Sequence, residues 1–191
     1  MSTPLPRLRT KIGFADLPAR LSPANFPYMS RPVHAIAAVA TGRVIGNAGR
    51  LPWSFAADTA YFMGMTRGGV MIEGPGCYAE LGGALPDRET IVISRDLEKK
   101  FPGAMKASSL DEALALAERS AFPGPVWIAG GQWLYEEALS RCEKLCLTVI
   151  SASYPGDRFF PDWSSTHPRL ESSRSEIESG VALLFNVYSK S

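Results

Sequence analysis

Short runs of apolar residues alternate with helix-like segments from His34 to the end of the chain. Residues 70–72, 90–93 and 125–128 are continuous runs rich in β-branched side chains, and each is followed by a turn and a helix-like segment. Continuous apolar runs are typical of parallel strands that are buried on both faces. The pattern therefore predicts one α/β domain over residues 34–191, with a mixed, mainly parallel central sheet flanked by helices.

Two further signals place elements within this domain. Ser109 and Glu112 have the spacing of a capping box, which predicts a helix that reaches to about Arg119. Residues 145–150 and 182–188 read as strands separated by polar turns. They predict an antiparallel hairpin at the C-terminal edge of the sheet.

Residues 1–33 differ from the rest of the chain. They combine several prolines and a group of basic residues with a single acid, Asp16, and show no sustained periodicity. This composition predicts a poorly ordered N-terminal extension, and we expect that folding and catalysis do not require residues 1–30. It lacks the apolar run of a secretory signal, and its prolines argue against the amphipathic helix of a transit peptide. Translation from Met29, which would remove most of the extension, stays open as an alternative.

Composition excludes several classes of partner. The formal net charge is +1 and the body of the chain has no long basic run, so we expect no nucleic-acid partner. No apolar run reaches the ~18 residues of a membrane span, so we expect no membrane partner. Three cysteines and two histidines without metal-type spacing predict no metal site. Cys142 and Cys146 fit small buried hydrophobic residues in a reducing cytoplasm.

The candidate chemistry lies between Arg43 and Phe62. A loop with two glycines and the pair Pro52-Trp53 leads into a helix predicted to begin near Phe55. On that helix Asp58 shares one face with Phe62, four residues later. Burial disfavours the charged form of a carboxyl group and raises its pKa, so Asp58 is a candidate for handling a proton near neutral pH.

At these residues the chain resembles the dihydrofolate reductase family, and the resemblance covers roughly residues 34 to 189. The spacing from Pro52-Trp53 to Asp58 and on to Phe62 matches without a gap. The segments that carry the resemblance are Ile36–Ala40, Arg43–Gly46, Leu51–Trp53, Asp58–Phe62, Leu85–Arg88, Val92–Arg95, Gly130-Gly131 with Tyr135, Leu147-Thr148, Gly156-Asp157 and Phe160-Pro161.

The resemblance implies NADPH-dependent reduction of 7,8-dihydrofolate to tetrahydrofolate by a cytoplasmic monomer, with hydride transfer to C6 and protonation at N5. It implies that Asp58 binds the pterin edge and assists protonation, and that Thr148 supports the Asp58 carboxylate. Leu51 and Trp53 would lie on a loop that closes over the nicotinamide. Arg88 would clamp the glutamate α-carboxylate of the substrate, and the remaining substrate-binding residues would be Ile36, Ala37, Phe62 and Leu81.

The resemblance also implies a set of cofactor-binding residues. Arg95 would meet the 2′-phosphate of NADPH, and the Gly130-Gly131 pair would contain a cis peptide beside the nicotinamide. Asp157 would steady the closing loop. The other implied cofactor-binding residues are Ala38, Ile45, Gly46, Gly74, Ser94, Ala129 and Tyr135.

Three departures from the family pattern affect the cofactor side. Gly74-Pro75-Gly76-Cys77 replaces a turn that carries a cation and a hydroxyl, Ala129 replaces a larger aliphatic residue, and Glu73 is expected to add negative charge near an anion site. We therefore expect NADPH to be preferred over NADH but bound more weakly than is usual in the family.

Two alternative functions remain open. One is a related pterin or pyrimidine reductase of the same fold, such as the riboflavin-pathway reductase domain, although that relative lacks the Pro-Trp and Asp58 pattern. The other is a pterin- or nucleotide-binding protein with weakened catalysis. The altered turn at Gly74 to Cys77 is the reason to consider it.

Overall fold

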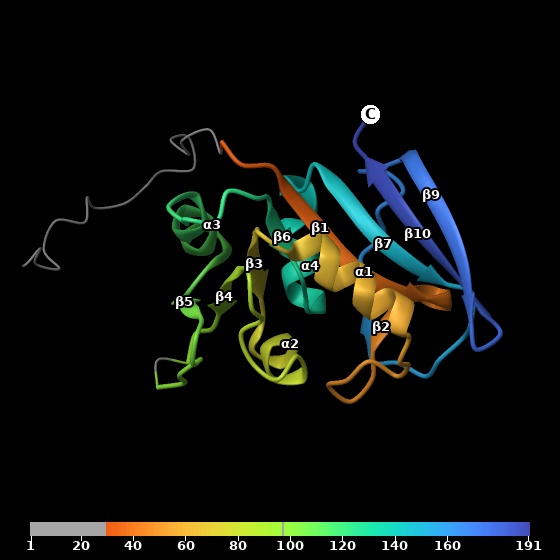
Figure 1. Ribbon diagram of the computed structural model, residues 1–191, viewed down its shortest axis with the longest axis horizontal. Helices are drawn as coiled ribbons and strands as arrows, with labels where there is room; N and C mark the ends of the chain where they lie inside the picture. The colour runs from red at the N-terminus through yellow and green to blue at the C-terminus, as the bar shows by residue number, and fades with distance from the viewer. Residues whose placement is uncertain (1–29, 97) are drawn as a thin grey trace, which may run out of the picture.

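In a computed structural model of the protein, which describes residues 30–96 and 98–191, the chain is built around one large sheet (Figure 1). The described residues form eight strands of this sheet in the order β5-β4-β3-β6-β1-β7-β10-β9. Its strands are β1 (Val33–Ala40), β3 (Val70–Glu73), β4 (Glu89–Ile93), β5 (Met105–Ala107), β6 (Val126–Ile128), β7 (Lys144–Ile150), β9 (Arg169–Glu178) and β10 (Val181–Ser189).

The pairing of the strands is mixed. The neighbours from β5 to β7 are parallel, whereas β10 is antiparallel to both β7 and β9. This confirms the predicted mixed, mainly parallel sheet with an antiparallel C-terminal hairpin. The hairpin itself joins β9 to β10, and the predicted strand 145–150 is β7, the parallel neighbour of β1.

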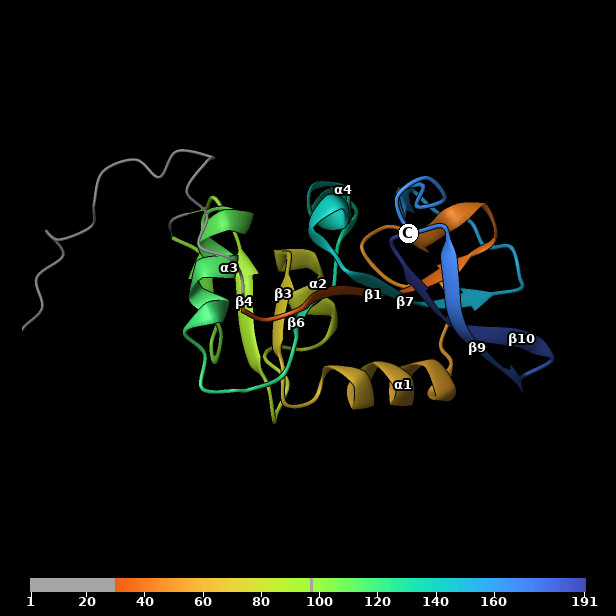
Figure 2. The same ribbon diagram turned by 90° about the horizontal axis from the view of Figure 1, so that it is seen from above.

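Helices cover both faces of the sheet (Figure 2). The helix α1 (Ala56–Thr66) lies on one side of the sheet, and α4 (Gln132–Ala138) lies on the other. The remaining helices are α2 (Pro75–Glu80), α3 (Leu110–Glu118) and the short 3-10 helices Thr41–Arg43 and Leu139–Arg141. Among residues 30–96 and 98–191, none of the helices has the length and apolar composition of a membrane span.

The alternation of side chains along β1 explains this layering. Ala35 and Val39 point into the larger core cluster with Leu134 of α4, whereas Ile36 points to the opposite face, where Phe62 of α1 packs. Successive side chains of a strand point to opposite faces, so one buried strand serves two cores. Because both faces are covered, β1 carries almost no polar side chain.

The predicted capping box is present with one change of partner. The Ser109 hydroxyl accepts a hydrogen bond from the Glu112 amide at 3.2 Å, as expected for the N-cap of α3. The Glu112 carboxylate reaches back to the backbone amide of Ser108 at 2.8 Å, one residue earlier than a standard box requires.

The sheet opens where β1 and β6 part. Their parallel pairing ends at Ala35 and Ile128, whereas β1 stays paired with β7 as far as Ala40. A second, two-stranded sheet is formed by β2 (Val44–Gly46), which follows β1 along the chain, and β8 (Arg158–Phe159). Carboxyl ends of parallel strands are where ligands bind in open α/β sheets.

The structure describes only the last residues of the predicted N-terminal extension. β1 begins at Val33, one residue before the expected start of the domain at His34. The guanidinium of Arg31 donates to the carbonyl oxygens of Ser120 and Gly124, at 2.7 and 3.3 Å. The rest of the predicted extension, and the alternative start at Met29, lie outside the described residues.

Candidate active site

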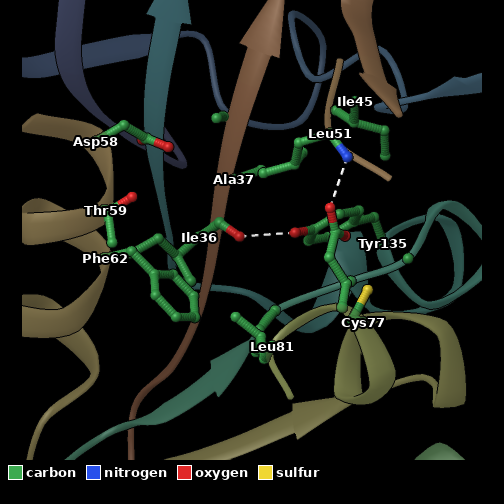
Figure 3. Close-up of a pocket in the computed structure, with 15 residues that line it drawn as sticks. Ile36, Ala37, Ile45, Leu51, Asp58, Thr59, Phe62, Cys77, Leu81 and Tyr135 are labelled. Carbon is green, nitrogen blue, oxygen red and sulfur yellow. Dashed lines mark hydrogen bonds between the residues drawn. The ribbon is translucent and has the colours of Figure 1, made fainter. Parts of the chain in front are cut away.

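A cavity of about 290 Å³ opens at the point where β1 separates from β6 (Figure 3). The helix α1 forms one wall with Asp58, Thr59 and Phe62, and Tyr135 and Cys77 lie on the opposite side. The lining residues are Ile36, Ala37, Ala38, Ile45, Leu51, Asp58, Thr59, Phe62, Cys77, Glu80, Leu81, Ala129, Gly130, Gly131 and Tyr135. Most of these were predicted as site residues, although they come from elements far apart in the sequence.

Other predicted site residues lie around this cavity rather than on its wall. Trp53 lines a neighbouring cavity of about 610 Å³, which shares Leu51, Asp58, Thr59 and Glu80 with the first. The predicted site residues outside the lining of both cavities are Gly46, Gly74, Arg88, Ser94, Arg95 and Thr148.

Asp58 lies in the first turn of α1 and faces the cavity. Burial raises the pKa of its carboxyl group, a hydrogen bond from the Thr148 hydroxyl lowers it, and the negative charge of Glu178 raises it again. The net shift is upward, as burial predicts. Asp58 is thus a carboxyl group with a raised pKa beside an apolar cavity, and it accepts a hydrogen bond from Thr148.

Leu51 is held over the cavity by α2. Its backbone amide donates a 2.6 Å hydrogen bond to Oε1 of Glu80, drawn as a dashed line in Figure 3. The preceding turn is closed by two backbone bonds between Asn47 and Arg50, of 2.8 and 3.1 Å. The positive φ of Ala48 and Gly49 suits the tight turn. The loop therefore has two anchors, a local turn and the carboxylate of Glu80.

Trp53 of the same loop is buried in the protein core. Its ring packs with Tyr154 at a centroid distance of 5.1 Å and belongs to a core cluster with Val44 and Phe55. Trp53 is therefore a buried support of the loop and a wall of the second cavity, beside Asp58. Leu51 occupies the position over the first cavity.

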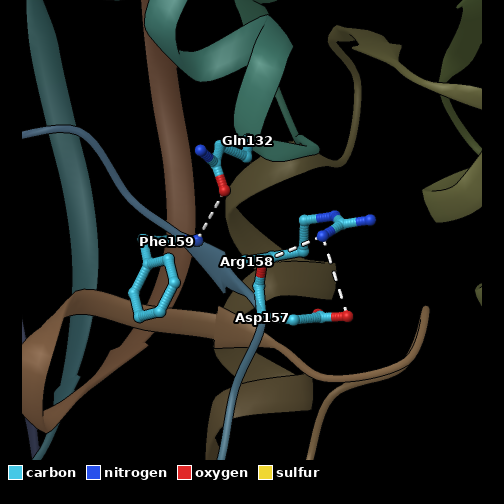
Figure 4. A network of polar contacts seen from close by, with 4 residues as sticks. All are labelled: Gln132, Asp157, Arg158 and Phe159. Atoms are coloured by element: carbon cyan, nitrogen blue, oxygen red, sulfur yellow. Dashed lines mark hydrogen bonds and ion pairs between the residues drawn. The ribbon is translucent and has the colours of Figure 1, made fainter.

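The loop before the cavity is braced from β8 (Figure 4). The Asp157 amide donates to the Gly46 carbonyl at 3.0 Å, whereas the Asp157 carboxylate lies 3.7 Å from Arg158. The side-chain carbonyl of Gln132 accepts from the Phe159 amide at 2.9 Å. Asp157 thus contacts the loop through its backbone amide. Gln132, the first residue of α4, binds the backbone of β8.

The opposite wall is built from backbone and two polar side chains. Gly130-Gly131 is joined by a cis peptide bond, as the resemblance implied. A Cβ atom on Gly130 would lie 3.0 Å from Sγ of Cys77 and 3.2 Å from the Tyr135 hydroxyl, so glycine is required there. The Tyr135 hydroxyl in turn donates to the Ile36 carbonyl at 2.7 Å, which links α4 to β1 across the cavity (Figure 3).

Glu73 corrects one expectation. It is fully buried at the end of β3, and burial raises the pKa of its carboxyl group to about 8. The side chain is therefore mostly neutral at pH 7 and adds little of the expected negative charge. Neither of its oxygens has a hydrogen-bond partner among residues 30–96 and 98–191, and an unpartnered buried carboxyl group favours its protonated form.

Arg88 is a buried, fixed guanidinium. Its Nε donates to the Pro86 carbonyl at 3.0 Å, and a terminal nitrogen donates to the Thr66 hydroxyl at the end of α1. Ser94 and the exposed Arg95 follow β4, at the same edge of the sheet as Gly74. The Gly74 amide donates to the Gly130 carbonyl at 2.8 Å, which joins the ends of β3 and β6.

Sequence reasoning missed several residues of the site. Thr59 and Cys77 line the cavity but carry no motif of their own, and Glu80 reads as an ordinary surface acid on a short helix. Glu178 acts on Asp58 from the far end of the chain, and no local signal points to such a pairing. No cluster of three or more potential metal ligands occurs among residues 30–96 and 98–191.

Comparison with known proteins identifies relatives over most of the chain. A family model described as dihydrofolate reductase matches residues 32–190. The chain is 37% identical over 145 residues to the type 3 dihydrofolate reductase of Salmonella typhimurium, covering 71% of this chain and 88% of the relative. It is 32% identical over 138 residues to the Bacillus subtilis (strain 168) dihydrofolate reductase, covering 72% and 80%.

A solved structure has the same fold. The dihydrofolate reductase from Enterococcus faecalis, complexed with NADP(H) and RAB-propyl, matches with a TM-score of 0.76 at 28% identity. The match covers 83% of this chain and 96% of that one.

The buried Glu73 makes stability depend on pH. Between about pH 4.5 and 8 the folded state keeps a proton that the unfolded state loses, so stability falls as pH rises, by at most about 1.4 kcal/mol per pH unit. Glu73→Gln cannot ionise and escapes this loss. We expect the difference in Tm, variant minus wild type, to increase steadily from pH 5 to pH 8.5. A difference that stays constant over this range, as expected for the exposed control Glu137→Gln, would show that Glu73 is not buried as an acid.

The bond between Glu80 and Leu51 holds the loop. Glu80→Ala removes a charge-assisted acceptor at an exposed position, so we expect a change in global stability of about 1 kcal/mol or less. Local protection should fall more clearly. Hydrogen–deuterium exchange of the segment containing Leu51 should become several-fold faster, whereas the segment containing β7 should not change. Equal exchange in variant and wild type would mean that Glu80 does not anchor the loop.

Proposed function

Because the chain belongs to the dihydrofolate reductase family, we propose that it catalyses the NADPH-dependent reduction of 7,8-dihydrofolate to 5,6,7,8-tetrahydrofolate. The observation that carries this proposal is the placement of Asp58. A carboxyl group with a raised pKa shares one apolar cavity with Phe62 and with the Gly130-Gly131 backbone. This arrangement suits a flat heterocycle that needs a proton beside a second flat ring.

The residues present fit the nicotinamide of NADPH. Ala38, Ile45 and Ala129 offer small apolar surfaces, and the two glycines expose backbone without a Cβ atom. When bound, the cofactor supplies the hydride for C6 of the pterin. Tyr135 and Gly74 support this part of the cavity, since each bonds to the backbone that forms its wall.

On the substrate side, we assign proton handling to Asp58. Its carboxyl group would hold the amino and N3 edge of the pterin and assist protonation at N5, with Thr148 fixing its orientation. Ile36, Phe62 and Leu81 would enclose the pterin and the benzoyl ring. Because these side chains are apolar and the site is narrow, they also keep water away from the reacting atoms.

The outer end of the substrate would meet Arg88. Its guanidinium is already fixed by Pro86 and Thr66, so little side-chain entropy would be lost when it binds a carboxylate. Leu51 would cover the cavity, held by Glu80, while Trp53 supports the loop from beneath. These roles follow the resemblance and the contacts that hold each side chain in place.

We further propose that the protein acts as a monomer in the cytoplasm and without a nucleic-acid partner. All the residues assigned above come from one chain, and Cys77, Cys142 and Cys146 form no disulfide. The related-reductase alternative is not favoured, because the named relatives are dihydrofolate reductases. A binding protein with weakened catalysis is separated from an enzyme by one assay: loss of absorbance at 340 nm when protein, dihydrofolate and NADPH are mixed.

Asp58→Asn tests the proton chemistry. The amide keeps the shape of the carboxyl group but cannot supply the same proton, so kcat for dihydrofolate should fall at neutral pH by roughly 10²–10⁴-fold, the usual contribution of a general acid or base. The loss should shrink at acidic pH, where solvent can protonate the substrate. An unchanged kcat across the pH range would remove Asp58 from the mechanism.

Arg95→Ala tests the reading of the 2′-phosphate. The family's second cation is replaced by Pro75, and a charged hydrogen bond contributes about 1.5–3 kcal/mol, so Arg95 alone should favour NADPH over NADH by roughly ten- to a hundredfold. The variant should bring kcat/KM for the two cofactors close together, mainly through KM. Arg119→Ala, at the exposed end of α3, is the control. If Arg95→Ala prefers NADPH as strongly as wild type, another group reads the phosphate.

A further inference from the structure

The helix that carries Asp58 has no cap of its own. Phe55 occupies the N-cap position of α1, and no side chain of the local sequence bonds to the first amides. The amide groups of a first helical turn lack partners within the helix and are usually satisfied by a nearby Ser, Thr, Asp or Asn. At α1 this need is met from elsewhere in the chain.

Glu178 supplies the missing cap. Its Oε1 accepts from the Ala56 amide at 2.8 Å, and its Oε2 accepts from the Ala57 amide at 2.9 Å. One carboxylate therefore binds the two amides that directly precede Asp58. The partners are 122 and 121 residues apart, so the contact depends on the tertiary fold rather than on the local sequence.

A tight hairpin fixes the position of Glu178. It is the last residue of β9 and pairs with Val181 across a two-residue turn, Ser179-Gly180, in which both φ angles are positive. Such turns hold the two strands in one register. Figures 1 and 2 both show the turn of the β9–β10 hairpin beside the start of α1. Phe185 of β10 also packs on Tyr61 of α1 at 4.9 Å, which holds the hairpin against the helix.

We propose that Glu178 is a positioning residue for Asp58, because it caps α1 from the C-terminal hairpin and places a second negative charge at the same end of the helix. The inference rests on the proposed function of Asp58. The positive end of the helix dipole favours the ionised form of Asp58, and a second carboxylate at this end offsets that positive potential. Glu178 thus opposes the ionisation of Asp58 while it anchors the helix.

The other groups around Asp58 show why this charge matters. Thr148 of β7 donates to the carboxylate and lowers its pKa, in opposition to burial and Glu178. Burial raises the pKa of the phenols of Tyr61 and Tyr135, so both stay neutral near pH 7. Arg174 of β9 lies 4.2 Å from the ring of Phe185, and Glu80 of α2 lines the same cavity.

The test compares two neutralised glutamates of one strand. Glu178→Gln removes the charge and keeps one acceptor oxygen, while Glu176→Gln removes a charge that pairs with Arg174. The pKa of Asp58 is read by ¹³C NMR of carboxyl-labelled aspartate, with the signal assigned by its absence in Asp58→Asn. We expect Glu178→Gln to lower this pKa by about 0.2–0.7 units, and Glu176→Gln to leave it within error. Glu178→Asp, which keeps the charge, should lie between wild type and Glu178→Gln.

A kinetic measurement adds a second readout. The pH at which kcat for dihydrofolate begins to fall should move downward in Glu178→Gln by the same amount, and in an Asp58→Asn background the substitution should cause no such movement. If Glu178→Gln lowers Tm but leaves the pKa of Asp58 and the pH profile unchanged, Glu178 is a structural cap and the proposal is wrong. Because NMR reads Asp58 without turnover, an inactive wild type would refute the proposed function and still leave this inference tested.

Discussion

The parting of β1 from β6 is the constraint on which the rest of the site depends. Parallel pairing stops at Ala35 and Ile128 because the chain must leave the sheet to enter α4, while β1 continues beside β7. The turn is made through Gly130, where any Cβ atom would meet Cys77 and Tyr135. The cavity is therefore a product of sheet topology, and side chains from both flanking layers can reach it only at this edge.

The three carboxyl groups around the cavity differ because their surroundings differ. Asp58 is partly buried with a hydroxyl partner, so its pKa is raised but it can still ionise. Glu73 is fully buried and has no hydrogen-bond partner in the described part of the chain, and its pKa rises to about 8. Glu80 is exposed and binds the amide of Leu51. Carboxyl groups thus serve here as the proposed proton-handling group, a neutral packing group and a loop anchor, according to burial and partner alone.

The sequence was sufficient for the elements whose pattern reflects burial. The apolar strands, the helix that carries Asp58 and the N-cap at Ser109 were all placed within a residue or two, since burial and capping leave a local signature. The strand β9 left none, because all but the last of its residues are exposed and its pairing with β10 depends on backbone bonds. The prediction that Glu73 adds negative charge was also wrong, since a sequence does not show what surrounds a side chain.

The two halves of the sheet carry different parts of the site. The residues that depart from the family pattern therefore lie apart from the residues that contact Asp58. Pro75 and Cys77 follow β3 in the parallel half, near the glycine pair assigned to the cofactor. Asp58 is instead supported from Thr148 and Glu178, which lie on β7 and β9. Changes in the first group alter the cofactor side without moving a contact of Asp58. The proton chemistry that we propose therefore depends on the C-terminal strands, and the proposed cofactor side can vary independently of them.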